Sequence, residues 1–330
     1  MDLRNSLAAF VPRTVWPLVD GAGNGSRKSG SVLFADLAGF TRLTDSLASI
    51  GKEGAEELTR ILNEFFSSMI KIVHEDGGDV LRFGGDAMTI FMPSGPGEAL
   101  KTALRLQAET AKYGAVETRA GVFALGMKIG VSFGDTVFSI VGDGSVGFDY
   151  FAAGSALDLS AECEHRAGQG NIVVCPRASE KIDFKNLRTV VLEGGFTLVE
   201  GPDNEAPPEN GPVRSEELQL PSEEALSEFL PFYIKDKLET TESFLVGEHR
   251  RTTVLFLSFK AEDYERDPSA VETARVVYRE TGRLVKKYGG FINKIDMGDK
   301  GSKVLAIFGS PLAVERQEEM GCRCALDIVS

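Results

Sequence analysis

Two aspartates stand at points where the chain is expected to leave a strand, and together they could bind a metal ion. Asp36 follows the apolar run 31–35, and a carboxylate at the end of a buried strand is costly unless something pairs with it. Asp86 closes the sequence Gly84-Gly85-Asp86, a signal for a tight hairpin turn. If the strand and the turn meet at one edge of a sheet, the two carboxylates form the ligand set that Mg²⁺ takes beside substrate phosphates.

The segment after Asp36 has the composition of a phosphate-binding loop. It consists of Leu37, Ala38, Gly39, Phe40 and Thr41. Gly39 permits a close backbone approach, and the free amides at the start of a following helix attract anions. Each aspartate also has a plainer interpretation, Asp36 as a helix cap and Asp86 as a turn residue. The strand end, the loop and the turn together are harder to obtain by chance.

The elements that would position these residues follow from periodicity. From Glu53 onward, apolar residues recur at intervals of three and four, which predicts an amphipathic helix that covers a sheet. These residues are Leu58, Ile61, Leu62, Phe65, Phe66, Met69, Ile70 and Val73. Gly77-Gly78 ends the helix, and residues 79–83 and 87–92 are predicted to be antiparallel strands joined by the turn.

The alternation of helices and strands continues beyond the hairpin. We expect a helix over 97–113, strands over 126–131 and 135–141 around a turn at Phe133-Gly134, a strand that enters a helix over 148–164, and a strand over 171–175. This order predicts an α+β fold in which helices cover a mostly antiparallel sheet.

The composition excludes several classes of function. The 330 residues are 42% hydrophobic and 26% charged and carry a formal net charge of −13, enough material for two globular domains. The acidic balance argues against a nucleic-acid partner or an anionic membrane surface. The sequence shows neither an apolar run of the length of a membrane span nor a signal peptide. The 4 cysteines lack paired CxxC spacing, which indicates free thiols in a reducing cytoplasm.

An internal repeat indicates tandem domains. The segment RTTVLFLSFKAEDY, which begins near Arg250, aligns with SVLFADLAGFTRL, and KKYGGFINKIDMGDKGSKVLAIFG aligns with HEDGGDVLRFGGDAMTIFM. We therefore predict a lead-in and flexible linker (1–30), a first domain (31–200), a linker with a helical lead-in (201–249) and a second domain (250–330). Because the chain stops within the expected second helix of the second copy, about half of that domain is expected to be missing.

The segments FADLAGFTRLT and GGDVLRFGGDAMTIF resemble the metal-binding half of a class III adenylate/guanylate cyclase catalytic domain. The resemblance implies the ferredoxin-like cyclase fold and a reaction in which the ribose 3′ oxygen of ATP attacks the α-phosphorus, giving cyclic AMP and pyrophosphate. It implies two Mg²⁺ or Mn²⁺ ions held by Asp36, Leu37 and Asp86. Residues 37–41 and Gly85 would contact the substrate phosphates.

The resemblance further implies that the two copies divide the remaining roles. Ser258 of the second copy stands at the position of Asp36, and Lys294 stands at the position of Arg82. In the family's paired units, a Lys at the latter position of the partner recognises the purine, so one working site would combine Asp36 and Asp86 with Lys294. The opposite site would be inactive or regulatory, with Arg82 as its basic residue.

The first copy departs from the family pattern on a later helix. The family's Asn, which positions the nucleotide, is replaced by Asp158, and the family's Arg, which stabilises the reacting phosphate, is replaced by Glu162. An anion at the Arg position repels a triphosphate by about 4 kcal/mol at 4 Å and an effective dielectric constant of about 20. In the family's paired units the partner domain supplies these two residues, and whether the missing part of the second domain does so here stays open.

Tandem cyclase domains of this kind resemble the soluble, bicarbonate-responsive adenylate cyclases. The resemblance implies cytoplasmic cyclic-nucleotide signalling, intramolecular pairing of the two domains, and downstream ATPase and helical-repeat modules. Lys294 favours ATP over GTP, since guanylate cyclases usually carry Glu at this position. Whether bicarbonate or another signal acts at Arg82 stays open.

Two alternatives remain. A diguanylate cyclase would share the Gly84-Gly85-Asp86 hairpin, but that family needs an acidic residue where this chain has Ala87. A catalytically inactive nucleotide-binding module that controls a downstream effector is favoured by Asp158 and Glu162, and it is opposed by the retained metal aspartates.

Overall fold

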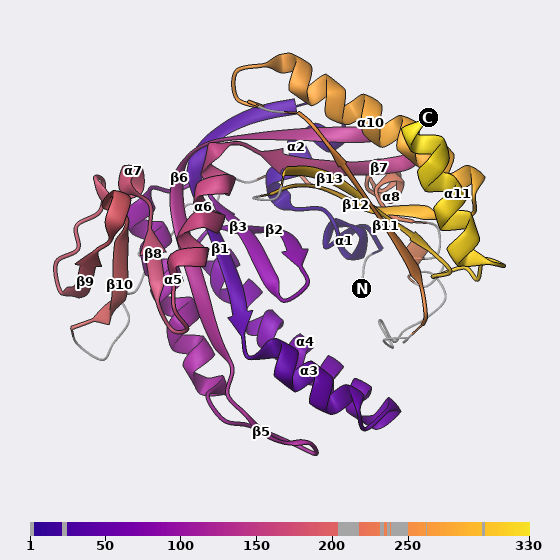
Figure 1. Cartoon of the computed structure of the whole chain (residues 1–330). Helices are drawn as coiled ribbons and strands as arrows, with labels where there is room; N and C mark the ends of the chain where they lie inside the picture. Colours follow the sequence, from indigo (N-terminus) through magenta and orange to yellow (C-terminus); the bar gives the residue numbers. More distant parts are fainter. Residues whose placement is uncertain are drawn as a thin grey trace. The chain divides into compact units, whose positions relative to one another are not determined.

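The computed structural model describes residues 3–21, 25–203, 218–231, 234–235, 238, 250–261, 263–298 and 301–330. They fall into two compact units, each discontinuous in sequence. Unit 1 comprises residues 1–27, 137–154 and 217–330, and unit 2 comprises residues 28–136 and 155–216. Figure 1 shows the elements of both units along the chain. The units do not coincide with the two sequence copies, so the predicted domain boundaries stay a prediction.

Unit 2 is built on one twisted sheet with the strand order β2-β3-β1-β6-β8-β10-β9. Its strands are β1 (Gly25–Ala38), β2 (Asp79–Gly84), β3 (Ala87–Met92), β6 (Gly126–Asp143), β8 (Ile172–Val174), β9 (Leu187–Val191) and β10 (Thr197–Pro202), with a separate small hairpin of β4 (Val116–Thr118) and β5 (Gly121–Phe123). Its helices are α3 (Phe40–Ala48), α4 (Lys52–Glu75), α5 (Pro96–Thr110), α6 (Ser155–Arg166) and α7 (Pro176–Ser179), and short 3₁₀ turns span Ala111–Tyr113 and Glu193–Gly195. Strand β6 pairs with β8 in parallel, whereas β1–β3, β2–β3, β8–β10 and β9–β10 are antiparallel.

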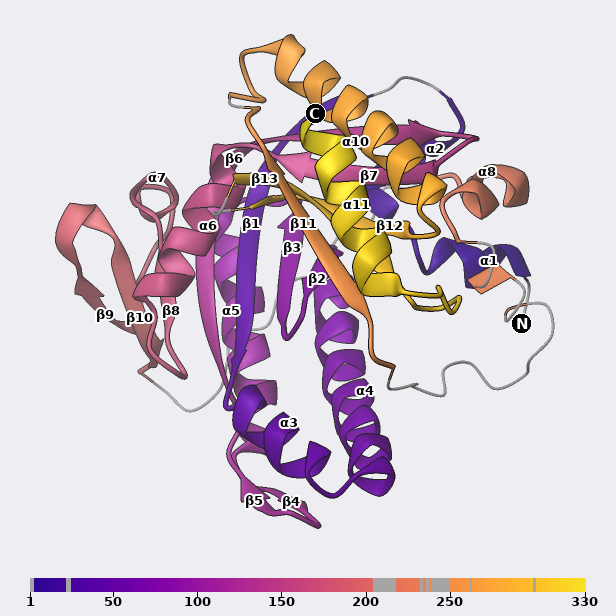
Figure 2. The same cartoon turned by 45° about the vertical axis from the view of Figure 1, so that its right-hand side comes forward.

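Helices cover both faces of this sheet. Helices α4 and α5 pack against each other on one face, where the apolar stripe of α4 meets the buried residues of β1 (Figure 2). Along β1, Leu33, Ala35 and Leu37 belong to that core, whereas Phe34 and Asp36 alternate with them and are only partly buried. Strand alternation therefore directs the carboxylate of Asp36 away from α4 and α5.

Helix α6 lies on the opposite face, directly over β6. The close approach depends on Gly130, because a Cβ at this position would lie 1.9 Å from the carbonyl oxygen of Ser160 and 2.5 Å from the amide nitrogen of Glu164. No side chain larger than hydrogen fits there without moving the helix backbone. The glycine thus sets how close α6 lies to the strand that carries Lys128.

Unit 1 contains the second copy together with a hairpin from the first. Its elements are α1 (Leu3–Ala8), a 3₁₀ turn (Arg13–Val15), α2 (Trp16–Val19), the end of β6 with β7 (Gly147–Ala153), α8 (Glu223–Glu228), β11 (Thr253–Phe259), α10 (Pro268–Lys287), β12 (Phe291–Gly298), β13 (Gly301–Phe308) and α11 (Gln317–Val329). The second copy forms its own sheet in the order β11-β13-β12.

The β6–β7 hairpin shares a hydrophobic core with the second copy within unit 1. Val141, Phe151 and Ala153 are buried in one cluster with residues of α10, β12 and β13. Polar contacts reinforce this core, since the amide of Ile295 donates a hydrogen bond of 3.1 Å to Oδ2 of Asp149. A part of the first sequence copy therefore stabilises the folded second copy.

Several predicted elements agree with the structure, and others differ from it or were missed, among them the β4–β5 hairpin and α7. The helix from Glu53, the helix over 97–113 and the hairpin of residues 79–92 are confirmed as α4, α5 and β2–β3. The turn at Phe133-Gly134 is wrong: β6 runs unbroken through both residues, and Gly134 lacks the positive φ of a reversing turn. Residues 25–30 are not a flexible linker but the polar beginning of β1, and β9 and β10 were not predicted.

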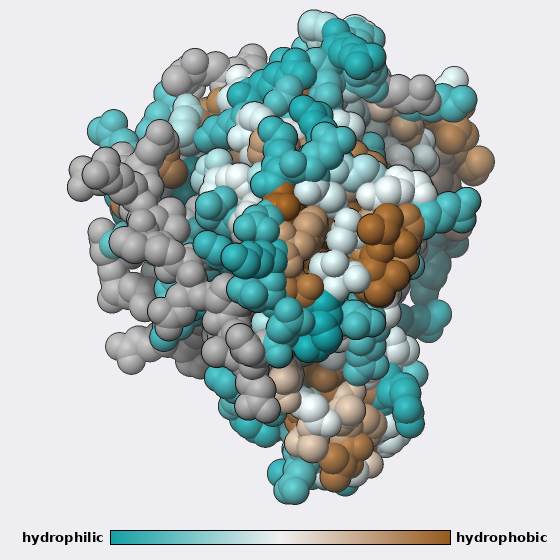
Figure 3. Space-filling model, turned by 90° about the vertical axis from the view of Figure 1, so that its left-hand side faces the viewer, coloured by the Kyte–Doolittle hydropathy of each residue, from teal (hydrophilic) through white to brown (hydrophobic). Residues whose placement is uncertain are grey.

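Several predicted features lie outside the described residues. These are most of the linker between the copies, part of its helical lead-in, and Asp299 and Lys300 at the tip of the β12–β13 hairpin. In the part of the chain that is described, no helix is long and apolar enough to cross a membrane. Among the residues that are coloured in Figure 3, hydrophilic ones surround several apolar patches.

Candidate active site

The structure brings Asp36 and Asp86 together at one edge of the sheet of unit 2. Strands β1 and β3 pair so that Asp36 stands opposite Ala87, the residue directly after Asp86. Gly84 pairs with Ala87 across the β2–β3 hairpin, which leaves Gly85 and Asp86 as a two-residue loop. Gly85 has a φ of 76°, as such a tight loop requires. The predicted juxtaposition of the two carboxylates is thus a consequence of strand register.

The electrostatics of Asp86 reflect this proximity. Burial raises the pKa of its carboxyl group above the ordinary value and is the largest effect, opposed in part by a backbone hydrogen bond that lowers it. The negative charge of Asp36 raises this pKa further, and the positive charge of Lys128 lowers it. Two carboxylates that repel each other at a partly buried sheet edge are stabilised by a shared cation. Both are accessible enough to bind one, since the side chain of Asp36 is 27% exposed and Asp86 is half-buried.

Lys128 supplies a cation at this site, and its role was not recognised from the sequence. Its Nζ lies 3.2 Å from Oδ2 of Asp36 and also donates a hydrogen bond to Oε1 of Glu164 on α6. Glu164 is almost fully buried, with 3% of its side chain exposed. The signals in the sequence were a lysine inside an apolar strand and a glutamate on the buried side of a helix, each costly to bury without a partner.

The segment after Asp36 forms the expected glycine turn into a helix. Gly39 has a φ of 89°, and a Cβ there would lie 2.5 Å from the carbonyl oxygen of Ala124, so glycine is required for both backbone conformation and space. The first helical hydrogen bond of α3 runs from the amide of Leu43 to the carbonyl of Gly39. The amides of Phe40 and Thr41 precede it, at the positive end of the helix dipole, where anions are stabilised.

The strand register confirms that the two copies were aligned correctly. Arg82 pairs with Thr89 after a shift in register between β2 and β3, and Lys294 pairs with Leu305 after the same kind of shift between β12 and β13. Ser258 stands opposite Lys303 as Asp36 stands opposite Ala87. Lys294 and Arg82 are therefore structurally equivalent.

Lys294 belongs to unit 1, whereas Asp36 and Asp86 belong to unit 2. The predicted meeting of the lysine with the two aspartates would join the two units and stays a prediction. On α6 of unit 2, Glu162 accepts a hydrogen bond of 2.7 Å from Nη2 of Arg166 one helical turn away. The carboxylate at the family's Arg position is thus engaged in an ion pair within α6.

The donor set of unit 2 fits a hard divalent cation that also binds substrate. No group of three or more His, Cys, Asp and Glu residues is arranged to hold a metal ion among the described residues. Asp36 and Asp86 provide two carboxylates, the number that Mg²⁺ takes when phosphate and water supply the other ligands. The ammonium of Lys128 beside Asp36 shows that this position accepts a positive charge.

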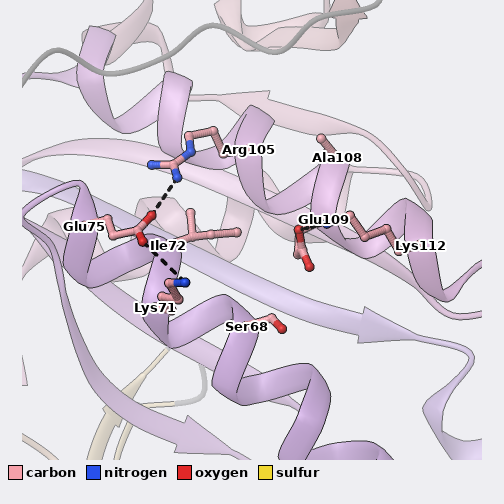
Figure 4. Close-up of a pocket in the computed structure, with 8 residues that line it drawn as sticks. All are labelled: Ser68, Lys71, Ile72, Glu75, Arg105, Ala108, Glu109 and Lys112. Carbon is pink, nitrogen blue, oxygen red and sulfur yellow. Dashed lines mark hydrogen bonds and ion pairs between the residues drawn. The ribbon is translucent and has the colours of Figure 1, made fainter.

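A cavity of about 500 Å³ lies elsewhere, between α4 and α5 (Figure 4). It is lined by Ser68, Lys71, Ile72, Glu75, Arg105, Ala108, Glu109 and Lys112. Its basic groups are engaged in ion pairs, Arg105 and Lys71 with Glu75 and Lys112 with Glu109. Because α4 and α5 lie on the face away from Asp36, this cavity is separate from the carboxylate pair.

Comparison with known proteins assigns the chain to a family. Residues 25–205 match the model of the family described as adenylate and guanylate cyclase catalytic domain. The chain therefore belongs to this family, the class III cyclases, and its α+β fold is the fold of that class.

Several curated relatives carry more specific names. Adenylate cyclase type 10 of Mus musculus is 27% identical over 323 residues, which cover 86% of this chain and 19% of that protein. The Homo sapiens protein of the same name is 24% identical over 343 residues, which cover 91% of this chain and 20% of that protein. An adenylate cyclase of Anabaena cylindrica is 27% identical over 147 residues, which cover 43% of this chain and 28% of that protein. The chain spans about a fifth of the length of the type 10 relatives.

Solved structures give a weaker likeness. A bacterial light-regulated adenylyl cyclase matches with a TM-score of 0.48 and 17% identity over 62% of this chain and 61% of the other. The guanylyl cyclase Cya2 matches with a TM-score of 0.43 and 21% identity over 60% of this chain and 100% of the other. The family assignment rests on the sequence match over residues 25–205.

Proposed function

We propose that this chain carries the metal-binding half of an adenylate cyclase site that converts ATP to cyclic AMP and pyrophosphate. The observation that carries the proposal is the register of β1, β3 and β2, which brings Asp36 and Asp86 to one sheet edge. The names of the relatives that cover most of the chain support ATP as the substrate. In the reaction, the bond between O3′ and the α-phosphorus forms as the bond between the α-phosphorus and the oxygen that bridges to the β-phosphorus breaks. Pyrophosphate leaves with that oxygen, and the proton of the 3′ hydroxyl passes to water.

Asp36 and Asp86 would hold two Mg²⁺ or Mn²⁺ ions, together with the backbone carbonyl of Leu37. Such ions, when bound, favour the deprotonated 3′ hydroxyl and neutralise charge on the leaving pyrophosphate. The protein's own part is to orient the triphosphate: the amides at the start of α3 and the turn at Gly85 would contact its oxygens. A Cβ at Gly84 or Gly85 would meet nothing within 4 Å, so the outer side of this turn is open.

Lys294 would complete the site by recognising the adenine ring. Its equivalence to Arg82 in strand register supports this role, since the same strand position is basic in both copies. We propose that the two cyclase copies pair within one chain in an intracellular signalling protein. Further modules, such as an ATPase or helical repeats, are proposed from the greater length of the type 10 relatives.

A second candidate is a nucleotide-binding module without catalytic activity that regulates a downstream effector. The feature that favours it is the carboxylate of Glu162 at the family's Arg position, paired with Arg166 on the helix surface. Such a module would bind ATP and a divalent ion without forming cyclic AMP.

Product analysis separates the two candidates. The protein that contains this chain is incubated with ATP or GTP and Mg²⁺ or Mn²⁺, and cyclic nucleotide and pyrophosphate are quantified by chromatography. Equal amounts of cyclic AMP and pyrophosphate from ATP, lost in Asp36→Asn, support the cyclase. Metal-dependent ATP binding without either product supports the regulatory module, and cyclic GMP from GTP alone contradicts the proposed substrate.

A further inference from the structure

Lys128 connects two carboxylates of unequal surroundings. Its Nζ contacts Asp36, which is 27% exposed, and Glu164, which is 3% exposed. Burial opposes the charge on Lys128, but hydrogen bonds to Glu164 and Asp36 and the charges of both carboxylates raise its pKa above the ordinary value. One ammonium thus forms ion pairs with a buried carboxylate, that of Glu164, and with a partly exposed one, that of Asp36.

Glu164 is fixed in this position by the packing of α6. The helix backbone rests on Gly130, two residues along β6 from Lys128, where no Cβ can be accommodated. A buried carboxylate requires a nearby cation, and a second basic group close to it is His165, whose Nε2 lies 3.7 Å from Oε2. Glu164 therefore anchors the ammonium of Lys128 close to the sheet edge.

The ion pair with Lys128 competes with a divalent cation for the negative charge of Asp36. A metal ion at Asp36 and Asp86 would place two further positive charges next to the ammonium, and like charges at such short range repel strongly. The lysine side chain is flexible, and it already contacts Glu164. It can therefore leave Asp36 and keep its hydrogen bond to Glu164. Displacement from Asp36 toward Glu164 relieves the repulsion.

We propose that Lys128 is a built-in counter-ion of Asp36: it occupies this metal ligand in the absence of a divalent ion and withdraws to Glu164 when the ion binds. The inference rests on the proposed function, because it takes Asp36 and Asp86 as the metal ligands. Glu164 is a positioning residue that acts through Lys128. The pair sets the metal affinity of the site and keeps the two aspartates from repelling each other when no ion is present.

The test measures binding of Mn²⁺ alone, by electron paramagnetic resonance of the free ion, without nucleotide. The double variant K128M/E164Q removes the lysine without leaving a buried unpaired carboxylate, and it is expected to bind Mn²⁺ about 10-fold more tightly, a change of roughly 1.4 kcal/mol. Glu164→Gln alone leaves the ammonium with Asp36 as its charged partner and is expected to weaken binding several-fold. A purely structural role would not shift the affinity in opposite directions.

Two controls accompany these variants. Lys112→Met with Glu109→Gln removes an exposed ion pair of the same unit, on the helix face away from Asp36, and should leave Mn²⁺ affinity unchanged. Asp36→Asn should abolish the tight Mn²⁺ site in every background. Thermal unfolding of each variant verifies that the measured protein is folded.

The outcomes separate this inference from the proposed function. If wild type binds Mn²⁺ through Asp36 but K128M/E164Q binds no more tightly, the counter-ion role is overturned and the metal site stands. The counter-ion role is likewise overturned if Glu164→Gln binds Mn²⁺ more tightly than wild type. If no folded variant binds Mn²⁺ in a manner that depends on Asp36, the metal site itself is overturned, and the counter-ion role with it.

Discussion

The three strands β1, β3 and β2 of the first copy and the strands β11, β13 and β12 of the second have the same order and pairing. The side chains at their ends differ in charge. Both have the same strand order, and both shift register one residue before the basic side chain, Arg82 in one and Lys294 in the other. In the first copy, Asp36 and Asp86 lie at the strand ends. In the second copy, Ser258 stands at the position of Asp36, and the hairpin that corresponds to Gly84-Gly85-Asp86 is longer.

The second copy also balances its charges differently. Lys303, which occupies the position of Ala87, lies opposite Ser258 and forms an ion pair of 3.3 Å with Asp296 on the neighbouring strand. The cation and the carboxylate come from adjacent strands and neutralise each other locally. In the first copy, the cation comes from β6 and the compensating carboxylate from α6. Similar backbones thus lead to a carboxylate pair in one copy and a neutral pair in the other.

The largest effect is expected from removing the carboxylate that the second copy lacks. Asp36→Asn or Asp86→Asn should reduce kcat/KM for ATP by about 10³-fold or more, because one proposed ligand of the catalytic ions is lost. Ser258→Ala is the matched variant in the second copy and should change activity less than about threefold. A comparable loss in Ser258→Ala would contradict the asymmetry of the two copies, as measured by the rate of cyclic AMP formation.

A smaller effect is expected at the equivalent basic positions. Lys294→Ala should reduce kcat/KM for ATP by about 10- to 100-fold, because the purine would lose a hydrogen-bonding partner, with a smaller change for GTP. Arg82→Ala removes the same charge from the first copy and should have a much weaker effect on unstimulated turnover. If kcat/KM falls equally in the two variants, the proposal that the second copy recognises the purine is wrong.

The loop after the first strand offers a test of stability. Gly39 needs a positive φ and meets the Ala124 carbonyl, whereas the aligned position of the second copy is Ala261 and shows no positive φ. Gly39→Ala should destabilise the fold by about 1–3 kcal/mol and lower Tm by several degrees, since the strained backbone has no room for Cβ. Ala261→Gly should change Tm by less than about 2 °C. Unfolding is followed by circular dichroism.

The sequence allowed the carboxylate pair to be predicted because the signals that create it are local. A strand that stops at Asp36 and a two-residue turn at Gly85-Asp86 are short-range patterns, and their meeting requires only that β1 pairs with β3. The repeat likewise made the equivalence of Lys294 with Arg82 recognisable by position. Both features depend on strand register, which the alternation of apolar residues specifies.

The contact of Lys128 with Asp36 and Glu164 depends on long-range packing instead. It requires β6 to neighbour β1 and α6 to rest on Gly130, neither of which a local pattern encodes. The false turn at Phe133-Gly134 has a related origin: the glycine there lies in a long strand whose far half packs with the second copy. Tertiary contacts decided these features.

The smallest effect is expected from the ion pair that replaces the carboxylate site in the second copy. The side chains of Lys303 and Asp296 are 26% and 30% exposed, and a partly exposed pair of this kind contributes about 1 kcal/mol or less. Asp296→Asn should therefore lower Tm by no more than about 4 °C, with a smaller difference at high salt, and leave Mn²⁺ binding unchanged. A loss of Mn²⁺ binding on this substitution would mean that the second copy contributes a carboxylate to the metal site, and the division of roles between the copies would have to be abandoned.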